Sequence, residues 1–327
     1  MRTPNLLGSL LFPLIVTIIL AAAPWSYALN QRSSKPSSSV TPSSQLKYHN
    51  GRIIAGPAPI HVYIIWYGEF SPIHKTTITA FFSSFNQSVN PIIKRHPTVS
   101  TWWSTTQSYK NVKGKSVPSR VRLFGEVSDP KCSLGKNLKR ADIATLVKKT
   151  IAKKAFPVDK TAMYLVLTAS DVRVEQFCLN SCGFHNSVLV SPRRRVVYAH
   201  VGDPGTQCPG YCAWPYAAPA HGPPSQVLVS PNGVGIDGMV MNVATILAGT
   251  ATNPFNTGYF QGNALAPLEA VTACSGIFGK GAYPGYPGKL LMDRRSKASY
   301  NVNGVKGHKF LLPAMWDLLT KTCTVTG

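Results

Sequence analysis

The chain has 327 residues and is strongly basic, with 34 Lys and Arg against 12 Asp and Glu and a formal charge of +22. Such a surplus concerns partners and solubility rather than the fold. The few acids are scattered singly, which argues against an enzyme built on paired carboxylates. Neither a P-loop, a G-x-S-x-G elbow, an H-E-x-x-H segment nor a G-x-G-x-x-G after a predicted strand occurs, so we expect no cofactor and no recognisable catalytic group.

The N-terminus predicts secretion. Arg2 precedes an almost wholly apolar run over 6–23, and Ser26-Tyr27-Ala28 supplies small residues for cleavage after Ala28. A membrane anchor is the alternative, but no positively charged flank follows the run. We therefore predict a signal peptide over 1–28, a flexible Ser/Pro-rich leader over 29–46 and a single domain over 47–327 with no later transmembrane segment. Loss of Arg2 with the signal leaves +22 − 1 = +21 on a mature chain expected in the extracellular space.

The first predicted elements alternate between strand and helix. Residues 61–67 are β-branched and aromatic and apolar on both faces, which indicates a buried strand. Ser71 and Pro72 then mark a helix start. The expected inner face of this helix consists of Ile73, Ile78, Phe81, Phe82 and Phe85. The alternating pattern over 120–126 predicts a half-exposed strand.

Further along, a helical stripe runs from about 139 to 155, buried strands follow over 162–168 and 194–200, and a third helix spans 238–249 with Gly249 as its stop. Alternating strands and helices predict an α/β domain with a layered sheet, flanking helices and a loop-rich C-terminal half.

Seven cysteines favour disulfides in an oxidising compartment. The candidates are Cys178, Cys182, Cys208, Cys212, Cys274 and Cys323, and the odd count leaves one thiol over. Two C-x-x-x-C pairs would also allow a zinc cluster, although predicted secretion favours disulfides. A Cys182–His185 catalytic pair is less expected than a structural cysteine beside a surface histidine.

The sequence carries one candidate site for glycan attachment and several basic clusters. Asn86-Gln-Ser88 is the one N-x-[ST] sequon with a permitted middle residue, so Asn86 is the candidate glycosylation site. Basic residues cluster over 131–160, 193–195 and 289–309. A secreted protein seldom meets nucleic acid, so an acidic polysaccharide is the favoured partner, with an anionic membrane surface or plain solubilising charge as alternatives.

Several motifs together resemble the plant EXORDIUM (phosphate-induced protein) family. In chain order they include Tyr48-His-Asn-Gly51, Ile65-Trp-Tyr-Gly68, Cys208-Pro-Gly-Tyr-Cys-Ala-Trp-Pro215, Asp237-Gly-Met239, Leu247-Ala-Gly-Thr250, Ala266-Pro-Leu-Glu-Ala270 and Leu311-Leu-Pro-Ala-Met-Trp-Asp317. The resemblance covers nearly the whole chain after the leader. It implies a cell-wall protein of the apoplast linked to brassinosteroid-responsive growth and cell expansion, without an established reaction.

The resemblance also carries expectations about residues. Cys132 stands outside the six cysteines typical of the family and is the expected odd thiol. Distant microbial relatives carry a zincin-like H-E-L segment where this chain has Ala244-Thr-Ile-Leu247. On that alignment Thr245 and Ile246 replace a metal ligand and the general base, so the fold would be a degenerate zincin-like scaffold, with Asp237 and Glu269 as relics of a cleft.

The leading hypothesis is a secreted growth regulator that acts by binding an acidic cell-wall polysaccharide or a cell-surface protein. The rival hypotheses are a wall-polymer hydrolase that uses Glu269 or Asp237 and a pectin-binding matrix protein that adheres through charge.

Overall fold

A computed structural model describes residues 45–87 and 97–326. The predicted signal peptide and nearly all of the predicted leader lie outside these residues. Leu46, which the predicted leader includes, is 5% exposed and belongs to the core, so ordered packing includes at least this last leader residue.

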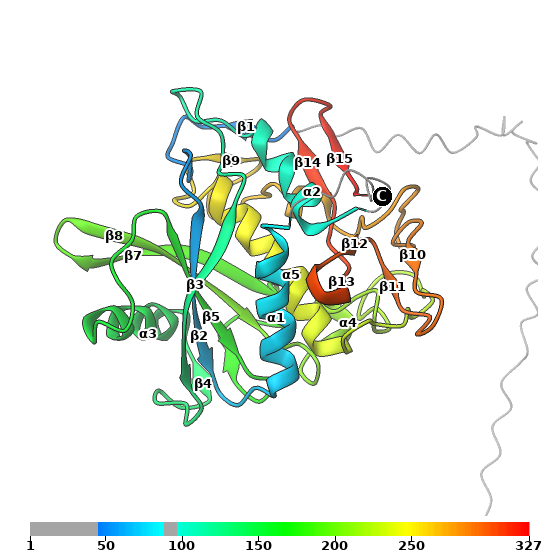
Figure 1. The fold of residues 1–327 in the computed structure, drawn as a ribbon, viewed down its shortest axis with the longest axis horizontal. Helices are drawn as coiled ribbons and strands as arrows, with labels where there is room; N and C mark the ends of the chain where they lie inside the picture. Colours follow the sequence, from blue (N-terminus) through cyan, green and yellow to red (C-terminus); the bar gives the residue numbers. More distant parts are fainter. Residues whose placement is uncertain (1–44, 88–96, 327) are drawn as a thin grey trace, which may run out of the picture. The chain divides into compact units, whose positions relative to one another are not determined.

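The centre of the domain is a five-stranded sheet in the order β3-β2-β5-β8-β7 (Figure 1). Its strands are β2 (Ile60–Tyr67), β3 (Val121–Asp129), β5 (Ala162–Thr168), β7 (Gly183–Ser191) and β8 (Arg194–Gly202). The first four in spatial order are parallel, and β7 pairs antiparallel with β8 at one edge. The apolar composition of β2 and β5 is explained by this arrangement, because strands inside a parallel sheet are covered on both faces.

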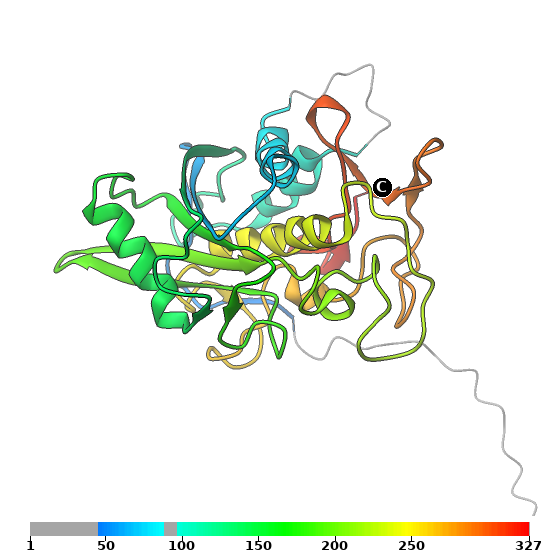
Figure 2. The ribbon, with the colours of Figure 1, turned by 90° about the horizontal axis from the view of Figure 1, so that it is seen from below.

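Helices cover both faces of the sheet, which confirms the predicted α/β layers. Helices α1 (Pro72–Ser84), α2 (Val99–Trp103) and α5 (Val234–Thr252) pack on one face, and α3 (Arg140–Ala152) packs on the other (Figures 1 and 2). The α1 helix begins as predicted, with the Ser71 hydroxyl accepting a hydrogen bond from the His74 backbone amide at 3.1 Å. Trp102 and Trp103 are buried between α1 and the C-terminal segments.

Three details differ from the prediction. Ile73 is 70% exposed. It lies five residues before Ile78 on α1, about 140° around the helix axis, and so faces away from the core. Gly249 does not end α5, which begins at Val234 and continues to Thr252. The edge strand β7 was not predicted, because its polar residues alternate weakly and it follows a cysteine-rich segment.

The remaining strands and α-helix of the described residues are short, and the strands form two-stranded sheets. They are β1 (Lys47–Tyr48), β4 (Asn137–Leu138), β6 (Arg173–Val174), α4 (Pro209–Cys212), β9 (Tyr259–Phe260), β10 (Leu291–Met292), β11 (Ser299–Tyr300), β12 (Val302–Asn303), β13 (Lys309–Phe310), β14 (Met315–Asp317) and β15 (Thr322–Thr324). The C-terminal half is therefore rich in loops, as predicted.

The α5 helix is long and apolar enough to cross a bilayer by length and composition, contrary to the expectation that no later segment would be. Most of it is buried inside the domain, where Val243, Ala244 and Leu247 are fully covered. Its apolar character is that of a core helix.

Candidate functional site

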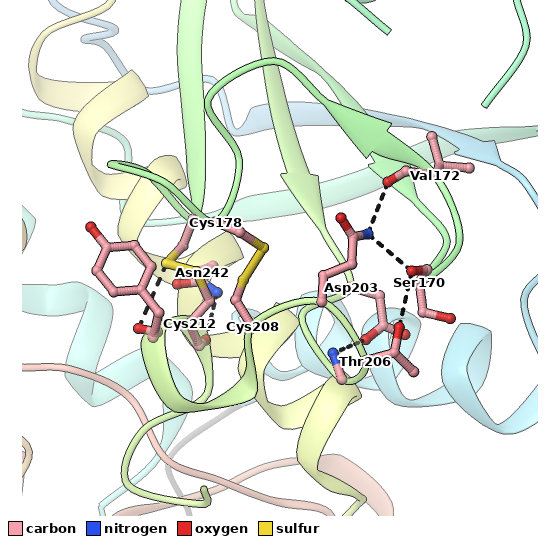
Figure 3. Close-up of a disulfide and its surroundings, with 12 residues drawn as sticks. Ser170, Val172, Cys178, Asp203, Thr206, Cys208, Cys212 and Asn242 are labelled. Carbon is pink, nitrogen blue, oxygen red and sulfur yellow. Dashed lines mark hydrogen bonds between the residues drawn. A yellow bond between two sulfur atoms is a disulfide. The ribbon is translucent and has the colours of Figure 1, made fainter. Parts of the chain in front are cut away.

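Two disulfides join the segment before β7 to the α4 turn. Cys178 pairs with Cys208 and Cys182 with Cys212, so each C-x-x-x-C unit is bonded to the other in parallel register (Figure 3). The third disulfide joins Cys274 to Cys323. Because these six sulfur atoms are bonded in pairs, the alternative zinc cluster has no thiolates available.

These disulfides help to wall a cavity of about 560 Å³ over α5. Its floor is the outer face of the helix, where Asn242, Thr245 and Ile246 are exposed to the cavity. The Asn242 amide nitrogen donates to the Cys212 carbonyl at 2.9 Å, which fixes the α4 turn against the helix (Figure 3). The cavity therefore forms where segments far apart in the sequence meet, among them the motifs over 208–215, 266–270 and 311–317.

The cavity is lined by aromatic rings and neutral polar groups. The rings are Tyr211, Trp214 and Phe278, and the polar side chains include Asn180, Asn242, Thr245, Thr272 and Ser275. The described residues that line it include no Lys, Arg, His, Asp or Glu. Small-molecule sites commonly combine apolar walls with a few placed polar groups, and this lining suits a neutral, hydroxylated ligand.

The zincin-like expectation can be tested on the floor residues. Thr245 donates its hydroxyl to the Met241 carbonyl at 2.9 Å, and Ile246 has only an aliphatic side chain. Within residues 45–87 and 97–326, no cluster of three or more His, Cys, Asp or Glu could hold a metal. The residues present do not fit a zinc ion, because such a site needs at least three protein ligands.

Glu269 lies in a closed polar cluster beside α5. Its two carboxylate oxygens are each 3.0 Å from His185 Nε2, and Asn253 donates its amide to Oε1 at 2.7 Å. The side chains of His185 and Glu269 are only 6% and 10% exposed. Gly249 allows this approach, since a Cβ there would lie 2.3 Å from Glu269 Oε2. The cluster anchors the segment that forms one cavity wall, and it is shielded from solvent.

Asp237 is buried in the first turn of α5. Asn232 donates to it from the backbone amide at 2.8 Å and from the side-chain amide at 2.7 Å. Burial raises the pKa of Asp237 to about 7, although the hydrogen bonds from Asn232 and the Gly233 contact oppose the shift. This carboxyl group holds the start of α5 against the preceding loop.

The structure does not bring the two predicted relic carboxylates together. Gly249, which contacts Glu269, lies twelve residues after Asp237 on α5, a separation of about 18 Å along the axis at about 1.5 Å per residue. Glycosidase carboxylates stand about 5–10 Å apart. Asp237 and Glu269 thus belong to opposite ends of the helix, and neither lines the cavity.

A glycine run at the start of α5 has a packing role. Gly233-Val-Gly235-Ile-Asp-Gly238 matches G-x-G-x-x-G but follows an irregular segment rather than a strand. A Cβ on Gly235 would lie 2.4 Å from the buried Asp203 carboxylate, and one on Gly238 would lie 2.7 Å from Pro204. Because Asp203 occupies the space in front of the run, this helix start does not suit a phosphate.

Asn86 and Cys132 lie away from the cavity. Asn86 is exposed just after α1, and its Nδ2 atom, which would carry a glycan, donates to the Val121 carbonyl at 2.8 Å. Ser88 of the sequon lies outside the described residues. Cys132 is buried and is the one described cysteine without a disulfide. Burial, with a smaller contribution from Asp171, raises the pKa of its thiol.

Comparison with known proteins agrees with the motifs. The family model for the phosphate-induced protein 1 conserved region matches residues 46–326. The chain is 45% identical over 282 residues to Protein EXORDIUM-like 2 of Arabidopsis thaliana, covering 85% of this chain and 88% of that protein. It is also 45% identical to Protein PHOSPHATE-INDUCED 1 of Nicotiana tabacum over 284 residues (85% and 87% covered) and to Protein EXORDIUM of Arabidopsis thaliana over 287 residues (85% and 88% covered). No solved structure matches. The chain therefore belongs to the EXORDIUM (phosphate-induced protein) family.

Proposed function

We propose that this protein is secreted into the plant cell wall and contributes to brassinosteroid-responsive growth by binding a neutral wall glycan in the cavity over α5. The observation that carries the proposal is the lining of that cavity, in which aromatic rings and neutral polar groups face one another without a charged side chain. Three disulfides support an oxidising, extracellular compartment.

Binding is favoured over hydrolysis for a chemical reason. A hydrolase needs an acid and a base or nucleophile within reach of the substrate. Glu269, which follows the lining residue Leu268, is held by His185 and Asn253 in the closed cluster, and Asp237 is buried at the other end of α5. The rings of Trp214 and Tyr211 instead offer flat apolar surfaces against which a sugar ring can pack.

The test is binding of the mature chain to an array of neutral and acidic wall oligosaccharides at low and physiological salt. We expect salt-independent binding of a neutral oligosaccharide, because no charge lines the cavity. Trp214→Ala should weaken it by about thirtyfold, which corresponds to about 2 kcal/mol, the scale of an interface hot spot. Thr245→Leu provides a second test, since it adds bulk at the cavity floor while leaving Trp214 in place.

Tyr283→Ala is the matched control, because it removes an aromatic ring that is 64% exposed outside the cavity. Unchanged neutral-glycan binding in both Trp214→Ala and Thr245→Leu would refute the cavity as the site. Absence of binding to every neutral glycan would redirect the search to a protein partner at the cell surface.

A further inference from the structure

The four parallel strands share a charge pattern along their length. Basic residues stand at the starts of β3, β5 and β8, and His61 stands at the start of β2. The cations are Arg120, Arg122, Lys160, Arg193, Arg194 and Arg195. Acids end or follow the same four strands: Glu69 after β2, Asp129 at the end of β3, Asp171 after β5 and Asp203 after β8.

Parallel pairing makes these charges add rather than cancel. The amino ends of all four strands lie at one end of the sheet, which we call the basic edge. Their carboxyl ends lie at the opposite end, which we call the acidic edge. None of the six cations at the basic edge forms an ion pair with any residue in the described ranges. Their charge is therefore available to a partner.

Open α/β sheets usually bind ligands at the carboxyl ends of their strands, which here form the acidic edge. The usual position is between two neighbouring strands whose chain connections lead to opposite sides of the sheet. Here that position lies at the ends of β2 and β5, and the chain covers it. The Tyr67 hydroxyl donates to the Gly135 carbonyl at 2.7 Å and accepts from the Leu134 amide at 2.8 Å, which holds a loop over the end of β2.

The basic edge has a cavity of about 580 Å³ on the α3 side of the sheet. Its aromatic surface is formed by Tyr63 and by Phe124, which is 54% exposed, and its cations are Lys160 and Arg194. Both views place the tip of the β7–β8 hairpin, where β8 begins at Arg194, beside α3 (Figures 1 and 2). The exposed Lys153 and Lys154 immediately after α3 precede the Pro157–Lys160 segment, which forms another wall.

One carboxylate also lies in this cavity, but its oxygens are already occupied. Asp159 Oδ2 is 2.6 Å from His61 Nδ1, and Oδ1 accepts from the backbone amide and hydroxyl of Thr161 at 2.8 Å each. Asp159 therefore fixes the cavity wall, and Lys160 and Arg194 remain without a carboxylate partner among the described residues.

We propose that the cavity at the amino ends of the parallel strands binds a carboxylated polysaccharide, with the Arg194 guanidinium and the Lys160 ammonium on a sugar carboxylate and the Phe124 ring against a sugar face. The planar guanidinium matches a carboxylate with two parallel hydrogen bonds. The remaining cations at the edge continue the positive surface along a polymer chain. This site is separate from the cavity over α5 and goes beyond the proposed function.

A polyuronate is preferred over other polyanions because of the concave shape and the exposed ring. A membrane-binding surface inserts its aromatic residues among the lipid headgroups, whereas Phe124 lines a cavity. Attraction by charge alone would also be screened by salt, whereas the Phe124 contact adds a component that salt does not remove.

The experiment measures affinity of the mature chain for polygalacturonate and for its methyl ester, which has the same backbone without free carboxylates. Arg194→Ala/Lys160→Ala should weaken polygalacturonate binding by about tenfold or more, as expected for loss of charge-assisted hydrogen bonds. The control Lys280→Ala/Lys321→Ala removes the same charge from two exposed residues outside the cavity and should change the affinity by less than about threefold. Phe124→Ala should reduce the binding that survives at about 0.15 M salt.

Equal losses in the two double variants would overturn the proposal, since only net charge would then matter. Equal binding of the methyl ester would overturn carboxylate recognition. Tighter binding to anionic lipid vesicles or to duplex DNA than to polygalacturonate would assign the edge to another class of polyanion. Trp214→Ala should leave polygalacturonate binding intact, so a failure of the neutral-glycan site and a failure of this site are distinguishable.

Discussion

Replacing Gly249 by Ala tests the closed cluster beside α5. In an ordinary helix interior this change stabilises a protein by about 1 kcal/mol. Here the added methyl group would lie 2.3 Å from Glu269 Oε2 and 3.2 Å from His185 Nε2, and the first distance is far inside van der Waals contact. The carboxylate must therefore move away from the helix.

The displaced carboxylate would give up its hydrogen bonds to His185 and Asn253 in a closed site. A hydrogen bond to a charged group contributes about 1.5–3 kcal/mol, and overpacking a core costs about 1–3 kcal/mol. Against about 1 kcal/mol of improved helix propensity, we expect Gly249→Ala to lower the free energy of unfolding by about 2–4 kcal/mol. Urea unfolding with the disulfides intact measures this difference.

The background variant Glu269→Ala provides the decisive comparison. It removes the carboxylate that the new methyl group would meet, so adding Gly249→Ala to it should stabilise the protein by up to about 1 kcal/mol. The same substitution thus changes sign between the two backgrounds, and a double-mutant cycle reports the coupling. Stabilisation in the wild-type background, or the same effect in both, would refute the packing derived for Gly249 and Glu269.

Three further predictions concern buried groups and disulfides. The pKa of Asp237 is raised to about 7, so the folded state holds the proton of this carboxyl group more tightly than the unfolded state does. The stability that this gives is fully present below about pH 4 and is lost as pH rises through 7, which lowers the free energy of unfolding by up to about 4 kcal/mol. Urea unfolding should therefore show wild-type stability falling relative to Asp237→Asn between pH 5 and pH 8, and a relative rise would contradict the shift. Cys274→Ala/Cys323→Ala opens a loop spanning 49 residues and should lower the free energy of unfolding by about 4 kcal/mol in the same assay, so a loss below about 1 kcal/mol would count against this bond. Cys132 should resist a thiol reagent in the folded protein and give one reactive thiol per chain in guanidinium, because it is buried and its thiol pKa is raised, and rapid labelling of the folded chain would contradict its placement.

Local patterns were sufficient for the elements whose burial follows from their own residues. The β2 and β5 strands are apolar on both faces, and the structure buries both faces. Ser71 and Pro72 start α1 as their chemistry requires. By contrast, β7 is defined by its pairing with β8, and its own residues alternate too weakly to indicate it.

Gly249 shows why a local rule fails where packing decides. A glycine near the end of an apolar helical stripe usually marks a stop, but here the missing side chain admits Glu269 from a segment twenty residues away. Likewise, Asp237 and Glu269 were linked through the zincin-like alignment, but the length of α5 between Asp237 and Gly249, where Glu269 packs, keeps the two carboxyl groups apart.

The sequence by itself determined the basic charge, the alternation of strands and helices, the cysteines available for pairing and the family motifs, because each depends on residue identity or on neighbours within a few positions. Only the tertiary structure decided which cysteines pair, that the cavity over α5 is uncharged, and that cations from three strands gather at one edge of the sheet. Those features join residues 30 or more positions apart, and their meeting depends on the order and direction of the strands.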